Sequence, residues 1–262
     1  ENETWGVAPR LKKAVAGKID EVIPAPLYKK AQVDDKCSTL TLTFKGDYAI
    51  EFRAYDEAAA YRFISTRKGA YTVKNEISEY AFAGEPTVFC SYTRSNANKE
   101  FSEQYFNSFE TPYVIEPMTK MGQKRLMFLP VLVDMGDRKV CITETDLTSY
   151  PGMYLYNSNN DNTLESHYAP VPDKIKQGGH NMLQGLVESR KPYIAEVEGE
   201  RSFPWRICIV ANNDAELLDD DMVFRLSHEN VIGDTSWIKP GKVAWEWWND
   251  WGLRGVDFQP GV

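Results

Sequence analysis

Carboxylates are the most numerous side chains in this sequence that could perform acid–base chemistry or bind a metal. The chain has 38 Asp and Glu residues among 262, so some neighbouring pair is inevitable and the number alone predicts no chemistry. Glu144 differs by its position, because it follows a predicted strand at residues 139–143 and precedes Asp146 and a turn at 150–152. Solvated loop carboxylates have the same local sequence, because carboxylate ligands of a hard cation have no local signature.

The histidines and cysteines lack the spacing of a metal site. His167 and His180 are thirteen residues apart in a polar stretch, without a third ligand nearby. The cysteines are widely spaced and include no Cys-x-x-Cys pair: Cys37, Cys90, Cys141 and Cys208. Because they lie in or beside apolar stretches, we expect buried thiols, and up to two disulfides remain open.

Five of the seven tryptophans gather in the last 32 residues. They are Trp237, Trp245, Trp247, Trp248 and Trp251. Left in water, such a cluster would form a large apolar patch. We therefore expect it to pack against a further part of the protein, and we expect the natural protein to continue beyond Val262.

Charge and composition exclude several kinds of partner. The formal net charge is −8, which disfavours nucleic acid and anionic membranes because both attract concentrated Lys and Arg. No apolar run reaches the roughly 18 residues of a membrane span. The sequence has no P-loop, dinucleotide fingerprint or Gly-x-Ser-x-Gly elbow. A neutral sugar or a cation fits the negative net charge better. The 14 Tyr and 7 Trp are suited to stacking on sugar rings, although β-sheet cores also use aromatic residues.

Alternating apolar and polar residues predict a series of strands. The clearest are at 39–44 and 48–55, separated by a turn at 45–47. Others are predicted at 60–64, 69–73, 88–92, 126–133, 139–143, 192–197 and 203–211. This regular spacing predicts an all-β fold of the sandwich type.

Three segments do not follow this alternation. The first 36 residues are predicted to form a loosely organised, extended segment, and residues 157–184 a long irregular loop. One helix is predicted at 214–226, with Asp214 as its N-cap.

Several blocks of sequence resemble glycoside hydrolase family 97. The most specific block is DTSWIKPGKVAWEWWN at 234–249, followed by GVDF at 255–258. Further matches are FPWR at 203–206, YPGM at 150–153 after ITE at 142–144, and AYRF at 60–63. Glu246 stands where the family more often has Asp, which keeps a carboxylate but lengthens its reach.

The resemblance implies a bacterial, periplasmic or secreted enzyme that removes terminal sugars from α-linked glucosides or galactosides. Residues 1–232 would form a large β-super-sandwich of the galactose-mutarotase-like type. Residues 233–262 would form a linker and the first strand of a truncated (β/α)8 catalytic barrel. The catalytic carboxylates would lie on the barrel beyond this chain, which is therefore expected to be inactive alone.

The resemblance also implies site residues. Glu144 matches a glutamate of the N-terminal domain that helps to bind a calcium ion, with the other ligands on the barrel. Glu246, Trp248 and Asn249 would lie on or just past the first barrel strand and contact an α-linked oligosaccharide. Apart from the resemblance, Arg206 is expected to anchor an ion pair at the domain interface. The alternatives are a stand-alone carbohydrate-binding module with its own aromatic platform, or a structural β-sandwich module with the tryptophans in a dimer interface.

Overall fold

The computed structural model describes residues 3–26, 28–93, 100–105, 112–122 and 124–243. It has two compact units, Glu1–Ser227 and His228–Val262. The described part of the second unit, 228–243, consists of turns and irregular backbone, such as the bond from the Ile238 amide to the Thr235 carbonyl (3.0 Å). The predicted barrel strand around residues 244–249 lies outside the described residues. The predicted division at residue 232 stays a prediction.

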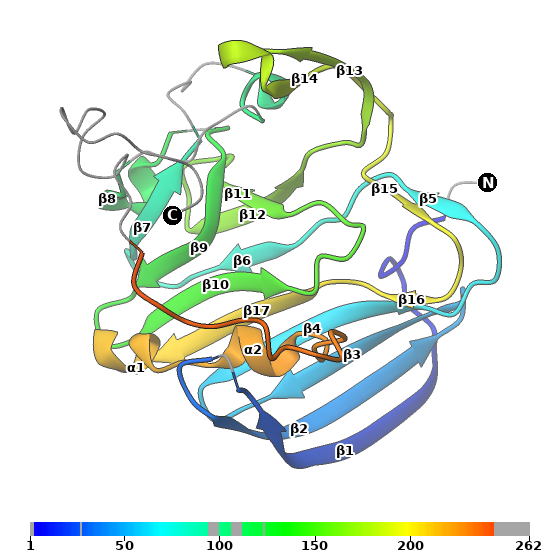
Figure 1. Cartoon of the computed structure of the whole chain (residues 1–262), viewed down its shortest axis with the longest axis vertical. Coiled ribbons are helices and arrows are strands. Elements are labelled where there is room, and N and C mark those ends of the chain that lie inside the picture. The colour runs from blue at the N-terminus through cyan, green and yellow to red at the C-terminus, as the bar shows by residue number, and fades with distance from the viewer. Residues whose placement is uncertain (1–2, 27, 94–99, 106–111, 123, 244–262) are drawn as a thin grey trace. The chain divides into compact units, whose positions relative to one another are not determined.

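The first unit is mostly β and contains one large antiparallel sheet (Figure 1). Its 13 strands are β1 (Leu11–Pro24), β2 (Gln32–Phe44), β3 (Tyr48–Ala54), β4 (Ala58–Ser65), β6 (Glu79–Ala81), β7 (Thr87–Tyr92), β8 (Val114–Pro117), β9 (Met127–Asp134), β10 (Lys139–Thr145), β11 (Met153–Tyr156), β12 (Thr163–Tyr168), β16 (Arg201–Ser202) and β17 (Trp205–Ala211). The main path runs β1-β2-β3-β4-β17-β10-β9-β11-β12-β6. The late strand β17 thus lies between β4 and β10, two strands far from it in sequence.

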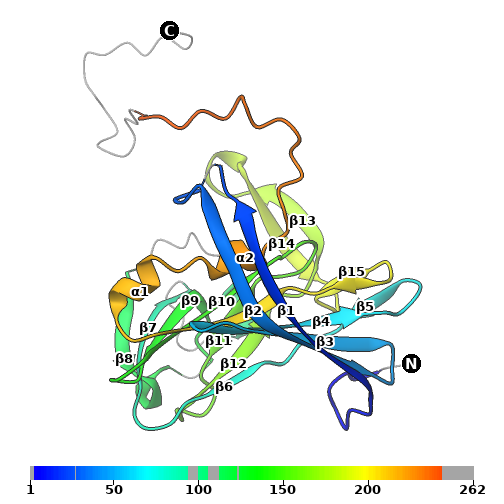
Figure 2. The ribbon, with the colours of Figure 1, turned by 90° about the horizontal axis from the view of Figure 1, so that it is seen from below.

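The N-terminal segment is extended as predicted, but its predicted loose organisation is wrong for residues 11–24 and 32–36, which are paired in strands. Residues 11–24 form β1, which pairs with β2 from Leu11 opposite Phe44 to Pro24 opposite Gln32 (Figure 2). Nearly all β1 side chains are exposed on both faces of the strand. Without a buried face there is no apolar alternation, so the period-two signal that reveals other strands is missing.

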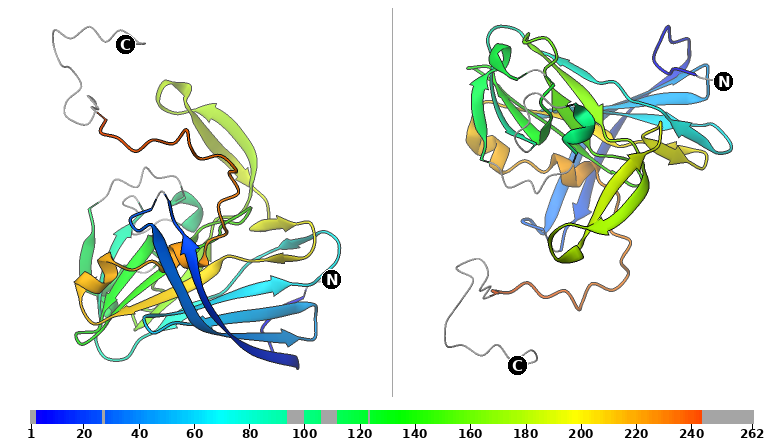
Figure 3. Two further views of the ribbon diagram at one scale, coloured as in Figure 1. Left: turned by 60° about the horizontal axis from the view of Figure 1, so that its bottom comes forward. Right: turned by 90° about the horizontal axis from the view of Figure 1, so that it is seen from above.

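The predicted irregular loop at 157–184 is also wrong, because it contains β12 and a further strand at residues 172–178. Two ribbons stand apart from the main sheet: β13 (Pro172–Gly178) with β14 (Gln184–Arg190), and β5 (Tyr71–Val73) with β15 (Ala195–Val197). The β13–β14 hairpin extends away from the main sheet and is largely exposed (Figure 3). The described residues also include the short 3-10 helices η1 (Phe101–Glu103), η2 (Met118–Lys120) and η3 (His180–Met182).

The predicted helix at 214–226 is present as two short helices, α1 (Asp214–Leu218) and α2 (Met222–Leu226). The N-cap of α1 is Asn213 rather than Asp214. The Asn213 Oδ1 accepts hydrogen bonds from the amides of Ala215 (3.0 Å) and Glu216 (3.2 Å), which otherwise lack partners at a helix start. In the described part of the chain, neither these helices nor any other is long and apolar enough to cross a membrane.

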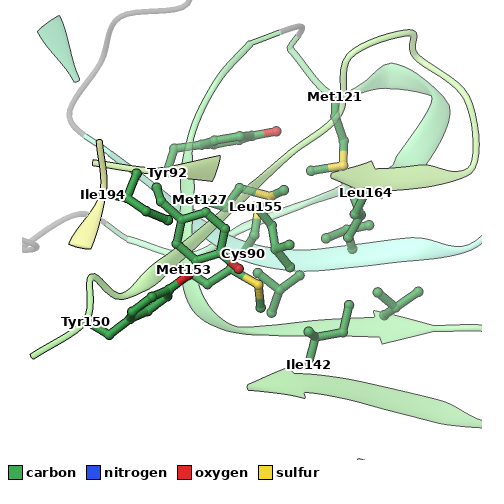
Figure 4. Close-up of a cluster of buried hydrophobic side chains, with 14 of the residues drawn as sticks. Cys90, Tyr92, Met121, Met127, Ile142, Tyr150, Met153, Leu155, Leu164 and Ile194 are labelled. Carbon is green, nitrogen blue, oxygen red and sulfur yellow. The ribbon is translucent and has the colours of Figure 1, made fainter. Parts of the chain in front are cut away.

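Two cores lie on opposite faces of β17 because successive side chains of a strand alternate in direction. Trp205, Ile207 and Ile209 pack in a small core that includes Met222 and Leu226 of α2. The opposite face of β17 turns toward the larger core, which strands β7 and β9 to β12 supply (Figure 4). Residues of that core include Cys90, Tyr92, Met127, Ile142, Met153, Leu155 and Leu164. Alternation therefore directs Arg206, which lies between Trp205 and Ile207, toward the larger core.

Candidate functional site

A buried arginine forms the centre of the candidate site. Arg206 is only 2% exposed, and each nitrogen of its guanidinium donates a hydrogen bond. Nε donates to Oε1 of Glu76 (2.8 Å), and Nη2 donates to Oε2 of the same carboxylate (2.9 Å). Nη1 donates to Oε2 of Glu144. Arg206 therefore binds Glu76 in a two-pronged, charge-assisted contact and uses its remaining nitrogen for Glu144.

The sheet register explains why Glu144 meets Arg206. Strands β10 and β17 are antiparallel neighbours, and Glu144 lies directly opposite Arg206 in their register. Residues opposite each other in an antiparallel pair point to the same face of the sheet. Glu144 therefore reaches the guanidinium from the neighbouring strand without any loop to carry it.

Glu76 reaches the site from the irregular segment between β5 and β6. Its Oε1 also accepts a hydrogen bond from the Tyr168 hydroxyl (3.1 Å), and its Oε2 from the Tyr150 hydroxyl (2.9 Å). Each carboxylate oxygen has two lone pairs, so all the acceptor positions of Glu76 are filled. The side chain is 12% exposed, and its four donors compensate for the loss of water.

Glu144 is less completely satisfied than Glu76. Its Oε1 accepts a hydrogen bond from the Met153 amide (2.8 Å), so each of its oxygens has one protein donor and one remaining lone pair. The turn before β11 passes close by, since a Cβ at Gly152 would lie 3.3 Å from this oxygen. Its side chain is 9% exposed. One further partner could therefore bind to each carboxylate oxygen.

The electrostatics of the site are unbalanced toward negative charge. Two carboxylates surround one guanidinium, which leaves one formal negative charge in a buried region. Burial raises the pKa of Glu144 to about 7, although the charge of Arg206 acts in the opposite direction. Burial alone would lower the pKa of Arg206, but the charge of Glu76 raises it well above its ordinary value. The excess charge favours a proton or a cation beside Glu144.

The tyrosines of the site remain hydrogen-bond donors at neutral pH. Burial raises the pKa of Tyr150 and of Tyr168, so both phenols keep their protons. Their rings also lie beside the guanidinium, with the Tyr168 ring centre 5.2 Å from the Arg206 Cζ. Tyr150 belongs to the edge of the larger core (Figure 4), so the ionic site and the apolar core share a boundary.

The described residues fit a calcium ion only in part. Calcium takes six to eight oxygen ligands at 2.3–2.6 Å. Among the residues that the structure describes, no three His, Cys, Asp or Glu side chains come close enough together to hold a metal. Glu144 has free lone pairs and could contribute one ligand, whereas Glu76 has none left. The predicted role of Glu144 as a calcium ligand stays a prediction.

The structure tests only some of the other predictions about site residues. Glu246, Trp248 and Asn249 lie outside the described residues, so their predicted substrate contacts stay predictions. Arg206 does form ion pairs, and both carboxylate partners belong to the first unit, whereas the predicted position of this pair at a domain interface stays a prediction. Sequence reasoning missed Glu76, which lies in a segment without alternation, a recognised motif or a neighbouring acidic pair.

His167 and the four cysteines lie among packed side chains, and within the part of the chain that the structure describes they belong to no metal site. His167 lies on β12, where its Nε2 is 2.6 Å from the Tyr105 hydroxyl and its ring packs on Phe101 (4.1 Å between centres). Burial lowers its pKa to about 4. The four cysteines are free thiols, and Cys37 and Cys90 are buried, as expected for residues beside apolar stretches.

The sequence matches a family model and two related proteins. Residues 1–228 match the family model described as Glycosyl-hydrolase 97 N-terminal. The chain is 45% identical over 259 residues to a retaining alpha-galactosidase of Bacteroides thetaiotaomicron, which covers 98% of this chain and 39% of that protein. It is 25% identical over 226 residues to a probable retaining alpha-galactosidase of Streptomyces bingchenggensis, covering 84% of this chain and 29% of the relative. The chain thus spans about two-fifths or less of the length of these relatives.

Solved structures share the fold. A glycoside hydrolase family 97 enzyme from Pseudoalteromonas sp. strain K8, in complex with acarbose, superposes with a TM-score of 0.68 at 18% identity. The match covers 89% of this chain and 32% of that enzyme, which is also known in complex with panose. A beta-arabinopyranosidase matches with a TM-score of 0.59 at 22% identity, over 78% of this chain and 32% of its own.

Proposed function

The chain belongs to glycoside hydrolase family 97, of which it contains the N-terminal domain, and we propose that it is the N-terminal part of an enzyme that hydrolyses α-galactosides. The observation that carries this proposal is the 45% identity to a retaining alpha-galactosidase, which extends over 98% of the chain. The enzyme bound to acarbose and panose is only 18% identical. α-Galactosides are therefore favoured over α-glucosides as substrates.

In this proposal, catalysis belongs to a barrel outside the described residues. Cleavage of a glycoside needs two carboxyl groups on opposite sides of the scissile bond. Glu76 and Glu144 are instead bound to the same guanidinium and are nearly buried. Residues 1–232 would form a super-sandwich that supports the barrel. Residues 233–262 would begin the barrel and bring Glu246, Trp248 and Asn249 to the sugar.

Glu144 would supply one calcium ligand, and the barrel would supply the others. The free lone pairs of Glu144 and the unbalanced negative charge of its surroundings support this role. A bound calcium ion would supply Lewis-acid chemistry by drawing electron density from a substrate oxygen. The contribution of this chain is to hold the Glu144 carboxylate in one orientation through Arg206 and the Met153 amide.

The proposal is tested by comparing this chain with the full-length enzyme on chromogenic α-galactoside and α-glucoside. The full-length enzyme should hydrolyse the α-galactoside with the higher kcat/KM and lose activity with a calcium chelator. Early NMR spectra should contain α-galactose, the anomer that a retaining enzyme releases first. Residues 1–262 alone should give no turnover. Clear turnover by this chain would mean that a complete catalytic pair lies within it.

The enzyme would be periplasmic or secreted. Its location is tested by fractionating the bacterium and detecting the enzyme with an antibody against this domain. Recovery with cytoplasmic markers would contradict this part of the proposal.

A further inference from the structure

We propose that Glu76 is a positioning residue, which holds Arg206 so that the Glu144 carboxylate is presented to a bound cation. This inference rests on the proposed role of Glu144 as a calcium ligand. Glu76 is nearly buried, and because all its acceptor positions are filled it has no free lone pair with which to bind a metal itself.

Glu76 determines which edge of the guanidinium is available to Glu144. Its two oxygens take the hydrogen bonds from Nε and Nη2, which form one edge of the planar group. Only Nη1 then remains directed at Glu144. A single contact orients the carboxylate and leaves lone pairs for a cation. A two-pronged contact from Arg206 to Glu144 would occupy both oxygens instead.

Glu76 is itself held from several sides. The hydroxyls of Tyr150 and Tyr168 donate to its two oxygens, one to each. Two residues further along, Ser78 anchors the segment, because its amide donates to the Ser166 hydroxyl (2.7 Å) and its own hydroxyl bonds that of Tyr61 (2.7 Å). These contacts connect an irregular segment to β4 and β12. Glu76 therefore has a fixed position without belonging to a strand.

The charges of the three groups lead to the same conclusion. With Glu76 present, Arg206 is shared between two carboxylates and one negative charge remains for a cation. Without that charge, Arg206 and Glu144 would form a neutral pair, and the guanidinium would compete with the cation for Glu144. Removing the charge of Glu76 should therefore weaken calcium binding even though Glu76 does not contact the ion.

The test is calcium binding to the full-length enzyme, measured by isothermal titration with calcium chloride and no substrate. The variants are Glu76→Gln, Glu144→Gln and the control Glu165→Gln. Glu165 lies on β12 and also accepts a hydrogen bond from a tyrosine, Tyr156 (2.8 Å), but it has no contact with Arg206. Glu76→Gln should weaken calcium binding by about 10- to 100-fold, as changes in groups that support a metal ligand do. Glu144→Gln should weaken it at least as much, and Glu165→Gln should leave it unchanged.

The outcomes separate this inference from the proposed function. Unchanged affinity in Glu144→Gln would overturn the role of Glu144 as a ligand. Loss of affinity in Glu144→Gln with wild-type affinity in Glu76→Gln would overturn only the positioning role. If Glu76→Gln does not fold, Tyr168→Phe keeps the ring and removes one donor to Glu76. It should weaken binding severalfold, and wild-type affinity in that variant would equally overturn the inference.

Discussion

Arg206 and Glu144 lie directly opposite each other on the antiparallel strands β17 and β10, and the Arg206 Nη1 donates a hydrogen bond to the Glu144 carboxylate. The guanidinium is almost fully buried, so water cannot compete with Glu144 for its hydrogen bonds. The pair therefore connects two strands that are more than 60 residues apart in sequence. Both the stability of the domain and the orientation of the proposed metal ligand depend on this contact.

Replacing Arg206 by Leu should destabilise the domain strongly. Leu is apolar and leaves Glu76 and Glu144 buried close together without a counter-ion. Breaking a buried ion pair by removing one partner typically costs about 3–5 kcal/mol. Urea unfolding of residues 1–262, followed by circular dichroism, measures the change in the free energy of unfolding.

Arg67→Leu is the matched control for Arg206→Leu. Arg67 pairs with Glu3 at 3.2 Å, but its side chain is 42% exposed. Such surface pairs contribute about 0–1 kcal/mol, because water competes for both charges. Similar losses in the two variants would contradict the view that burial makes the Arg206 contacts important.

The sequence predicts the strands of this site better than their arrangement. The segments of β10 and β17 are recognisable from alternation, but β10 extends to Thr145, so Glu144 lies within the strand rather than after it as predicted. That β17 inserts between β4 and β10 follows from long-range pairing, which local patterns do not encode. The sequence therefore predicts an ion pair for Arg206 but cannot identify its partners, Glu144 on β10 and Glu76 in the segment before β6.

The missed elements share a physical cause. β1 and β13 are exposed on both faces, so they have no apolar side to produce a period of two. Glu76 lies in a segment without regular structure, and its role depends on tyrosines and an arginine from three other places in the chain. Only the fold brings these groups together, so no spacing in the sequence could identify it.

The apolar residues of α2 should hold this helix against the sheet. Leu226 is buried beside Ile207 and Trp205, whereas Val223 on the same helix is 43% exposed. Leu226→Ala should lower the free energy of unfolding by about 2–5 kcal/mol, since it leaves a cavity. Val223→Ala should change it by about 0.5 kcal/mol or less. Equal effects in urea unfolding would contradict the packing of α2.

The four thiols should react slowly in the folded protein. Burial raises the pKa of Cys90 to about 12 and that of Cys141 and Cys208 to about 11, and it also raises the pKa of Cys37. At pH 8 only about one in a thousand of the Cys141 and Cys208 thiols would then be a reactive thiolate, and fewer of Cys90. Labelling with Ellman's reagent should be slow in buffer and should reach four thiols per chain in 6 M guanidinium chloride. Fast native labelling would contradict the raised pKa values of the thiols, and fewer than four thiols after unfolding would contradict their free state.

His167 should make the domain less stable as the pH falls below neutrality. Its pKa is lowered by burial from 6.5 to about 4 in the folded state. Between these values the unfolded chain binds a proton that the folded chain does not, so acidification favours unfolding. At pH 7 the imidazole is mostly neutral in both states and the effect is small. Allowing for its partial exposure, we expect a loss of about 1 kcal/mol between pH 7 and pH 5 from this residue.

The variant His167→Gln isolates that contribution. Gln keeps a polar group that can bond the Tyr105 hydroxyl, which is 2.6 Å from the imidazole Nε2, but it cannot take up a proton in this range. Other groups titrate in both proteins, so the comparison is between their changes in stability, measured by urea unfolding at pH 7 and pH 5. The wild-type domain should lose more stability than His167→Gln over this interval. An equal loss in both would mean that His167 takes up its proton as readily in the folded domain as in the unfolded chain.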